Sequence, residues 1–288
     1  MDDARSLLGL LDSSLNRPLP ERSYAEDCTL NWSVMYDQLD IFVLAHIFGW
    51  YAKALILRDV WLCWIISVMF EVCEYSLQHQ LPNFAECWWD HWVLDVLICN
   101  GIGIWAGMLT CRYFAMRTYS WRSIWTIPNV GGKMTRTIAQ FGPHGWISFD
   151  WAATKSFKGY MVVIIVTALW LLCELNCFYL KYLLWIPTPH IINQVRLLSI
   201  VFSGAVALRE CYQYFSDLQC KRLGTQAWVT IATILIEFLI CLKYGREAFS
   251  VPAPQSVIRF WIGFITILII FPIWQFYLRD RLPKFKSE

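Results

Sequence analysis

Residues 71–100 read EVCEYSLQHQLPNFAECWWDHWVLDVLICN, and this stretch decides how the chain is interpreted. It contains five acids, and apolar runs of transmembrane length lie on both sides. One ionisable side chain at the centre of a membrane helix costs about 2.5–3.5 kcal/mol on insertion scales. Five uncompensated acids would therefore rival the net stability of a whole domain, about 5–15 kcal/mol. The acids need a compensating charge, and a bound cation is the simplest candidate.

The overall composition is that of a polytopic membrane protein. Hydrophobic residues make up 57% of the 288 residues and charged residues only 16%, whereas soluble domains carry about 25% charged residues. The net charge is +2, and the basic residues are scattered at segment ends instead of forming a stripe along one face. This distribution argues against a nucleic-acid partner.

Apolar windows of about twenty residues predict an all-α fold with seven transmembrane helices. The predicted helices cover residues 40–57, 60–80, 91–117, 157–185, 191–215, 224–243 and 256–278. They form a single transmembrane domain over 40–278, preceded by a luminal segment 1–39 and followed by a cytosolic tail 279–288. The orientation follows from basic residues, because the 112–158 region carries seven and the 81–90 loop carries none. The 81–90 loop is therefore predicted to be luminal.

The acids fall at spacings that favour one cation site. Glu71 and Glu74 are three residues apart, which places them on one helix face, and Glu86 and Asp90 share a face if their stretch is helical. The 60–111 stretch contains no lysine or arginine that could neutralise them. Coordination by several oxygens suits calcium, manganese or magnesium better than zinc. We expect Ca²⁺, held by Glu71, Glu74, Glu86 and Asp90.

A histidine and three tryptophans are further candidates near this site. His46 lies inside the first predicted helix and, as a neutral imidazole near a metal-bound phosphate, could take a proton from a hydroxyl. The alternative is a histidine that only serves helix packing. Trp88, Trp89 and Trp92 are predicted to lie at the membrane interface, at the depth of lipid headgroups.

Polar and small residues in the other helices suggest helix contacts. Glu174 and Asn176 could pair with Arg196 or Arg209, and Arg209 could alternatively grip a lipid phosphate. Gly103 and Gly107 are spaced as GxxxG, which predicts close packing between two helices.

Eleven cysteines are present without a CxxC motif, so most are predicted to be packing residues. Cys28 and Cys87 are predicted to lie on the same side of the membrane, where a disulfide between them is possible. His91 is assigned as an interface or loop residue.

Three runs carry a family resemblance. They are LPNFAECWWDHWVLDVLICNGIGIWAGM at 81–108, DIFVLAHIFGW at 40–50 and DLQCKRLGTQAWV at 217–229. Together they resemble eukaryotic phosphatidylserine synthases of the base-exchange type. The resemblance implies calcium-dependent exchange of the choline or ethanolamine headgroup of a phospholipid for L-serine. It also implies a multi-pass protein of the endoplasmic reticulum membrane and no nucleotide-activated donor.

The resemblance also implies which residues are essential. The histidine, acids and asparagines of that family fall here on His46, Glu71, Glu74, Asn83, Glu86, Asp90, Asp95 and Asn100. We expect His46 to be catalytic, and Asn83, Asp95, Asn100 and Arg209 to bind substrate, with Asp95 and Asn100 able to complete the ion shell instead. Family members usually have further helices before the point that corresponds to Met1, so a shortened form or a fragment is expected. Homo-oligomerisation is left open.

Two other functions are compatible with intramembrane acids. A cation transporter would use them as a permeation path but predicts internal repeats, and none is visible. The second alternative is a shortened member of the family that has no catalytic activity. The chain lacks a GxxxxGK[ST] phosphate loop and the spaced Asp/Gly motif of CDP-alcohol phosphotransferases, which argues against a nucleotide-dependent route. The tail Lys284-x-Lys286 resembles a dilysine retrieval signal of endoplasmic-reticulum membrane proteins.

Overall fold

The computed structural model describes residues 1–19, 25, 27–29, 31, 41–114, 123–139 and 148–279. Within these ranges the regular elements are all helices, which confirms the all-α fold class. The long helices are α3 (Ile41–Leu57), α4 (Val60–Leu77), η2 (Asp90–Asn100) running on into α5 (Gly101–Tyr113), α7 (Phe157–Leu184), α8 (Ile191–Ser216), α9 (Thr225–Tyr244), and α11 (Gln255–Ile273) running on into η5 (Trp274–Leu278). The predicted tail signal at 284–286 lies outside the described residues.

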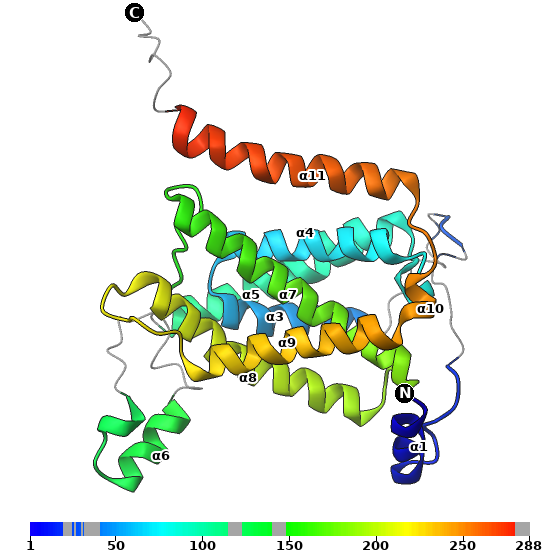
Figure 1. The fold of residues 1–288 in the computed structure, drawn as a ribbon, viewed down its shortest axis with the longest axis horizontal. Coiled ribbons are helices and arrows are strands. Elements are labelled where there is room, and N and C mark those ends of the chain that lie inside the picture. Colours follow the sequence, from blue (N-terminus) through cyan, green and yellow to red (C-terminus); the bar gives the residue numbers. More distant parts are fainter. Residues whose placement is uncertain are drawn as a thin grey trace, which may run out of the picture.

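Six of these helical segments are long and apolar enough to cross a membrane, and α3, with 17 residues, is a shorter apolar helix. Each of the seven helices predicted from the sequence is therefore present. The chain is a multi-pass membrane protein. In Figure 1 the long helices lie beside one another, with their connections gathered at the two ends of the bundle.

Short helices mark the two ends. They are α1 (Asp2–Leu11), η1 (Pro82–Phe84), η3 (Ile124–Thr126), α6 (Val130–Ala139) and α10 (Arg246–Phe249). Figure 1 shows α1 and α10 at one end and α6 at the other. At this end of the bundle, α1 contacts the carboxyl end of α7. Arg5 Nε donates to the Leu183 carbonyl at 2.9 Å, and the Arg5 guanidinium covers the Trp185 ring. This is the end that the charge pattern predicts to be luminal.

The helix pair α3 and α5 forms the tightest contact beside the site, because glycines remove the side chains between them. A Cβ atom added at Gly103 would lie 2.5 Å from the Ile47 carbonyl oxygen, and one at Gly107 would lie 2.7 Å from Ala54 Cβ. Both separations are shorter than van der Waals contact. The close packing predicted from the GxxxG spacing is therefore confirmed.

The partly buried charge pairs between the helices differ from those predicted. Glu174 on α7 pairs with Lys53 on α3, with Nζ 2.9 Å and 3.0 Å from its two carboxylate oxygens, and it also accepts from Trp170 Nε1. Arg196 on α8 pairs with Glu237 on α9 at 2.7 Å. The predicted pairing of Glu174 with Arg196 is wrong. It failed because the actual partners lie far apart in sequence and meet only through the arrangement of the helices.

The disulfide considered from the sequence is present. Cys28 and Cys87 are bonded, with their Cα atoms 5.3 Å apart and a sequence separation of 59. The remaining cysteines are free thiols within the described residues, which agrees with their assignment as packing residues.

Candidate functional site

Helix α4 supplies the first two acids of the site. Glu71 and Glu74 lie three residues apart and are buried, with exposed fractions of 3% and 8%. Ser67, one turn earlier on the same face, is fully buried. Helix α4 begins with a side-chain cap, because the Asp59 carboxylate accepts from the Leu62 N–H at 3.0 Å. The acids therefore sit well inside a properly capped helix, on the face that packs against η2.

The facing segment, η2, is π-helical over all eleven of its residues. In an α-helix, positions five apart point about 140° away from each other. In a π-helix the backbone hydrogen bonds run from i to i+5, so such positions lie nearly in line. Asp90, Asp95 and Asn100 have this spacing, and all three are buried. The π-helical backbone explains how one segment presents all three polar side chains to the interior.

His91 lies in the middle of the carboxylates, so its assignment as an interface or loop residue is wrong. Its ring is 3% exposed, and Nδ1 lies 2.8 Å from Glu71 Oε2, 3.7 Å from Glu86 Oε2 and 4.0 Å from Glu74 Oε2. Ligand atoms of Glu71, Glu74 and His91 all lie within 4.8 Å of one another. One signal was available, because His91 precedes Asp95 by four residues in the same apolar run.

Glu86 reaches this cluster from a loop. It lies in the non-helical link between η1 and η2, so the condition under which it would share a helix face with Asp90 is not met. Burial, followed by the charges of neighbouring acids, raises the pKa of Glu86 to about 8. Its Oε2 atom is buried without a hydrogen-bond partner among the described residues.

Asn100 leaves a second buried oxygen unsatisfied. Its Nδ2 donates to Ser67 Oγ at 2.9 Å, whereas Oδ1 has no hydrogen-bond partner in the described part of the chain. Buried polar atoms without partners are rare in folded proteins and call for an explanation. Here the unsatisfied oxygens of Asn100 and Glu86 belong to the same group of α4, η2 and loop residues as the carboxylates.

This donor set fits a divalent cation. Three carboxylates converge, and among the described residues the nearest basic group is the His91 imidazole. Glu71, Glu74, Glu86 and the Asn100 amide would provide oxygen ligands of the kind that calcium prefers, and the imidazole nitrogen would also suit manganese. Neither Glu86 nor Asp90 belongs to the group of Glu71, Glu74 and His91 whose ligand atoms lie within 4.8 Å of one another. Glu86 adjoins that group through its 3.7 Å distance to His91, whereas Asp90, the fourth predicted ligand, is buried at the start of η2.

His46 adjoins the cluster from α3. Its Nδ1 lies 2.8 Å from Asp95 Oδ1, and its side chain is 42% exposed. Asp95, predicted to contact substrate or the ion, is thus engaged with the imidazole. Two turns along α3, Lys53 covers the Trp50 ring at 4.0 Å and pairs with Glu174. His46 is therefore the polar residue of α3 that belongs to the site.

Two of the predicted substrate-binding residues lie elsewhere. Asn83, on η1, lines a small hollow against α7 that also includes Lys181. Arg209 is half-buried on α8, one turn before Tyr212. The Tyr212 hydroxyl accepts from the Asp150 N–H at 3.2 Å, which places this part of α8 at the predicted cytosolic end. The structure does not join either residue to the carboxylates.

The three tryptophans around the start of η2 do not behave alike. Trp88 and Trp92 are exposed, as expected for residues at a membrane interface. Trp89 is only 3% exposed, so its indole does not reach the surface of the bundle, and its depth in the membrane stays a prediction. It is one residue from Asp90 and packs inside the bundle.

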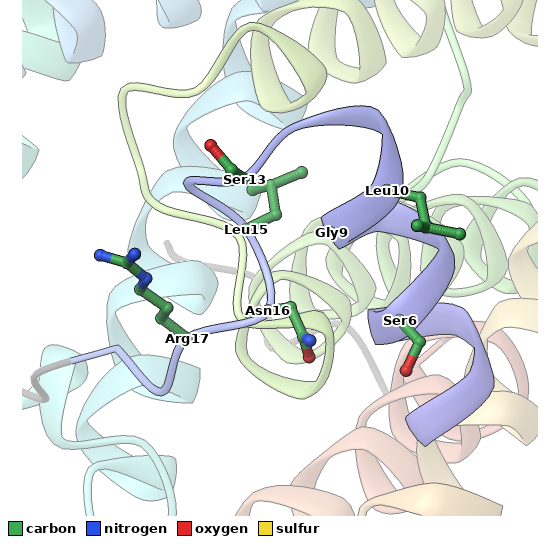
Figure 2. A pocket seen from close by; sticks show the side chains of 7 residues that line it. All are labelled: Ser6, Gly9, Leu10, Ser13, Leu15, Asn16 and Arg17. Carbon is green, nitrogen blue, oxygen red and sulfur yellow. The ribbon is translucent and has the colours of Figure 1, made fainter.

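A second hollow lies beside α1, and Figure 2 shows its lining side chains, which come from α1 and the segment that follows it. They are Ser6, Gly9, Leu10, Ser13, Leu15, Asn16 and Arg17. This hollow contains none of the acids or histidines discussed above, so the candidate site remains the cluster between α3, α4 and η2.

Comparison with known proteins identifies the family. The family model described as Phosphatidyl serine synthase matches residues 1–245. The chain belongs to the phosphatidylserine synthase family. It is 42% identical to human phosphatidylserine synthase 2 over 296 residues, which is 100% of this chain and 61% of that protein. It is 40% identical to zebrafish phosphatidylserine synthase 1 over 293 residues, 99% of this chain and 63% of that protein.

A plant relative has a different name. The chain is 37% identical to the rice protein CDP-diacylglycerol–serine O-phosphatidyltransferase 2, over 98% of this chain and 70% of that protein. The names of these phosphatidylserine synthase relatives thus include one that specifies a nucleotide-activated donor. The chain spans less than two thirds of the length of the human and zebrafish relatives.

Proposed function

We propose that this chain forms phosphatidylserine by exchanging the choline or ethanolamine headgroup of a phospholipid for L-serine in a calcium-dependent reaction. The observation that carries the proposal is the position of His46. Its imidazole is hydrogen-bonded to Asp95 next to a buried cluster of carboxylates. A base and a set of cation ligands are the two components that such a transfer requires. Family membership supports the product, and the endoplasmic reticulum membrane is the location we expect.

His46 acts as the general base in this proposal. With Asp95 accepting a hydrogen bond from Nδ1–H, the proton-free Nε2 atom is left to take the proton of the serine hydroxyl. The serine oxygen then forms a bond to phosphorus, the bond between phosphorus and the old headgroup oxygen breaks, and His46 returns the proton to the leaving alcohol. Since one phosphodiester replaces another, no nucleotide is consumed.

Glu71, Glu74 and Glu86, which converge on His91, would hold the calcium ion. When bound, the ion supplies Lewis acidity toward a phosphodiester oxygen. The Glu71 and Glu74 carboxylates are buried, which shields the ion site from water, whereas the neighbouring His46 side chain is 42% exposed.

The donor lipid is the point on which the named relatives differ. A base-exchange enzyme uses an existing phospholipid, whereas the name of the rice relative specifies CDP-diacylglycerol. The sequence supports exchange, because the spaced Asp/Gly motif of CDP-alcohol phosphotransferases is lacking.

The test is incorporation of radiolabelled serine by the purified protein in phosphatidylcholine or phosphatidylethanolamine nanodiscs, with calcium or with EGTA. We expect labelled phosphatidylserine and free choline or ethanolamine only when calcium is present, and neither product from His46→Ala. Incorporation that persists after complete chelation would remove calcium from the reaction. Incorporation that occurs only after CDP-diacylglycerol is added would refute base exchange, and none with either donor would favour an inactive member of the family.

A further inference from the structure

Cys87 connects the luminal disulfide to the proposed cation site. Its sulfur is bonded to Cys28, and it directly follows Glu86 in the chain. It is 1% exposed, whereas Cys28 is exposed. The disulfide thus joins a surface residue to the buried loop residue beside a proposed ligand.

The backbone of Cys87 also holds the start of η2, the helix that carries Asp90, His91, Asp95 and Asn100. Its carbonyl oxygen accepts from the Asp90 N–H at 2.9 Å and from the His91 N–H at 3.2 Å. These are among the first N–H groups of the helical segment, which have no partner within the helix itself. A shift of the Cys87 backbone would therefore move Glu86 on one side and the start of η2 on the other.

The loop needs such an attachment because it lacks regular structure. The 3₁₀ turn η1 ends at Phe84, and η2 begins at Asp90, so Glu86 is not held by a helical hydrogen-bond ladder of its own. The Glu86 carboxylate must nevertheless stay 3.7 Å from His91 to complete the cluster. The disulfide supplies a covalent restraint at the adjacent residue.

The same bond connects two segments that precede the helices on which His46 and Asp95 lie. Cys28 belongs to the segment before α3, and Cys87 belongs to the loop before η2. The two cysteines enclose α3 and α4 in one covalent loop. Covalent closure reduces the conformations open to both segments at this end of the bundle.

We propose that the Cys28–Cys87 disulfide is a positioning element of the cation site, which holds Glu86 and the start of η2 in the geometry that binds the ion. This inference deepens the proposed function and rests on its cation site. Supporting groups that orient metal ligands typically change metal affinity by about 10- to 100-fold when they are lost. We expect a loss of calcium affinity in that range when the bond is opened.

The test compares the oxidised full chain in nanodiscs with the same protein reduced by dithiothreitol, and with the double variant Cys28→Ser/Cys87→Ser. Calcium binding is measured by titration, and hydrogen exchange is followed at the amides of Asp90 and His91. Reduction should weaken calcium binding and speed exchange at these amides, and reoxidation should restore both. The double variant should resemble the reduced protein and should not respond to dithiothreitol. Cys220→Ser, which removes a free cysteine of the α8–α9 loop, should behave as wild type.

The outcomes separate this inference from the proposed function. If the oxidised protein binds calcium and reduction leaves the affinity unchanged, the disulfide does not position the site and the inference is wrong. If the oxidised protein does not bind calcium, the calcium part of the proposed function fails. In that case the hydrogen-exchange measurement decides. Unchanged hydrogen exchange at the Asp90 and His91 amides after reduction would overturn the positioning role as well.

Discussion

His46 on α3 and Asp95 on η2 are hydrogen-bonded, with Nδ1 and Oδ1 2.8 Å apart. The bond joins two helices that are far apart in sequence but are held in close contact by Gly103 and Gly107. An imidazole with one nitrogen engaged by a carboxylate has a fixed orientation and a fixed tautomer. The second nitrogen then becomes the basic atom, on a side chain that is 42% exposed.

Replacing Asp95 by Asn should test this orientation. We expect Asp95→Asn to lower serine incorporation by a factor on the order of 10² to 10⁴, the range contributed by a correctly placed general base. The amide keeps the shape of the side chain, but its NH₂ group can donate to the histidine and stabilise the wrong tautomer. Calcium binding should change little, because Asp95 engages His46. A calcium affinity that falls in parallel with the rate would instead make Asp95 an ion ligand.

Glu74→Gln should separate cation binding from proton transfer. The substitution removes one negative charge from the buried cluster, so we expect weaker calcium binding and a rate that recovers at higher calcium concentrations. His46→Ala should show the opposite pattern, with nearly intact calcium affinity and no headgroup exchange. The control is Glu247→Gln, which removes an acid from α10 at the same end of the bundle. Calcium titrations and serine incorporation on all three variants distinguish the two roles.

The helices and several contacts were predictable from the sequence because their signals are local. Each apolar run of about twenty residues became a helix, and the short first run became α3 with 17 residues. The GxxxG spacing predicted a close helix contact, which Gly103 makes with α3, and charge counts placed Cys28 and Cys87 on the same side, where they are bonded. In each case neighbouring residues carried enough information.

The parts that were missed depend on backbone form or on distant partners. The spacing of Asp90, Asp95 and Asn100 is visible in the sequence, but only a π-helix turns it into one face. His91 resembles any histidine in an apolar run until α4 brings Glu71 within 2.8 Å. For the same reason the partner of Glu174 could not be chosen among the basic residues before the helices were placed.

Lys53 and Glu174 should be energetically coupled. Removing one partner of a fully buried ion pair costs about 3–5 kcal/mol. The Lys53 and Glu174 side chains are 21% and 17% exposed, so Lys53→Met and Glu174→Met should each lower the unfolding temperature by less than that cost implies. The double variant should lose less than the sum of the two, because no buried charge remains. Thermal unfolding of the four proteins in the same detergent measures this coupling. Lys243→Met, on an exposed position at the end of α9, is the control. Additive losses would show that the two charges act independently.

Gly103→Ala should disturb both stability and activity. The new Cβ would lie 2.5 Å from the carbonyl oxygen of Ile47, which follows His46 directly, so α3 must shift where it carries the base. Overpacking of this kind costs about 1–3 kcal/mol. Gly107→Ala meets Ala54 at 2.7 Å, farther along α3, and should destabilise the protein comparably with a smaller loss of serine incorporation.

The matched control for both glycine variants is Gly263→Ala on α11, where a Cβ would meet nothing within 4 Å. This variant should unfold at the wild-type temperature or slightly above it, since alanine favours the helix. Unfolding temperature and serine incorporation are measured on all three variants. Equal activity losses in Gly103→Ala and Gly107→Ala would mean that general destabilisation, and not displacement of His46, lowers the rate.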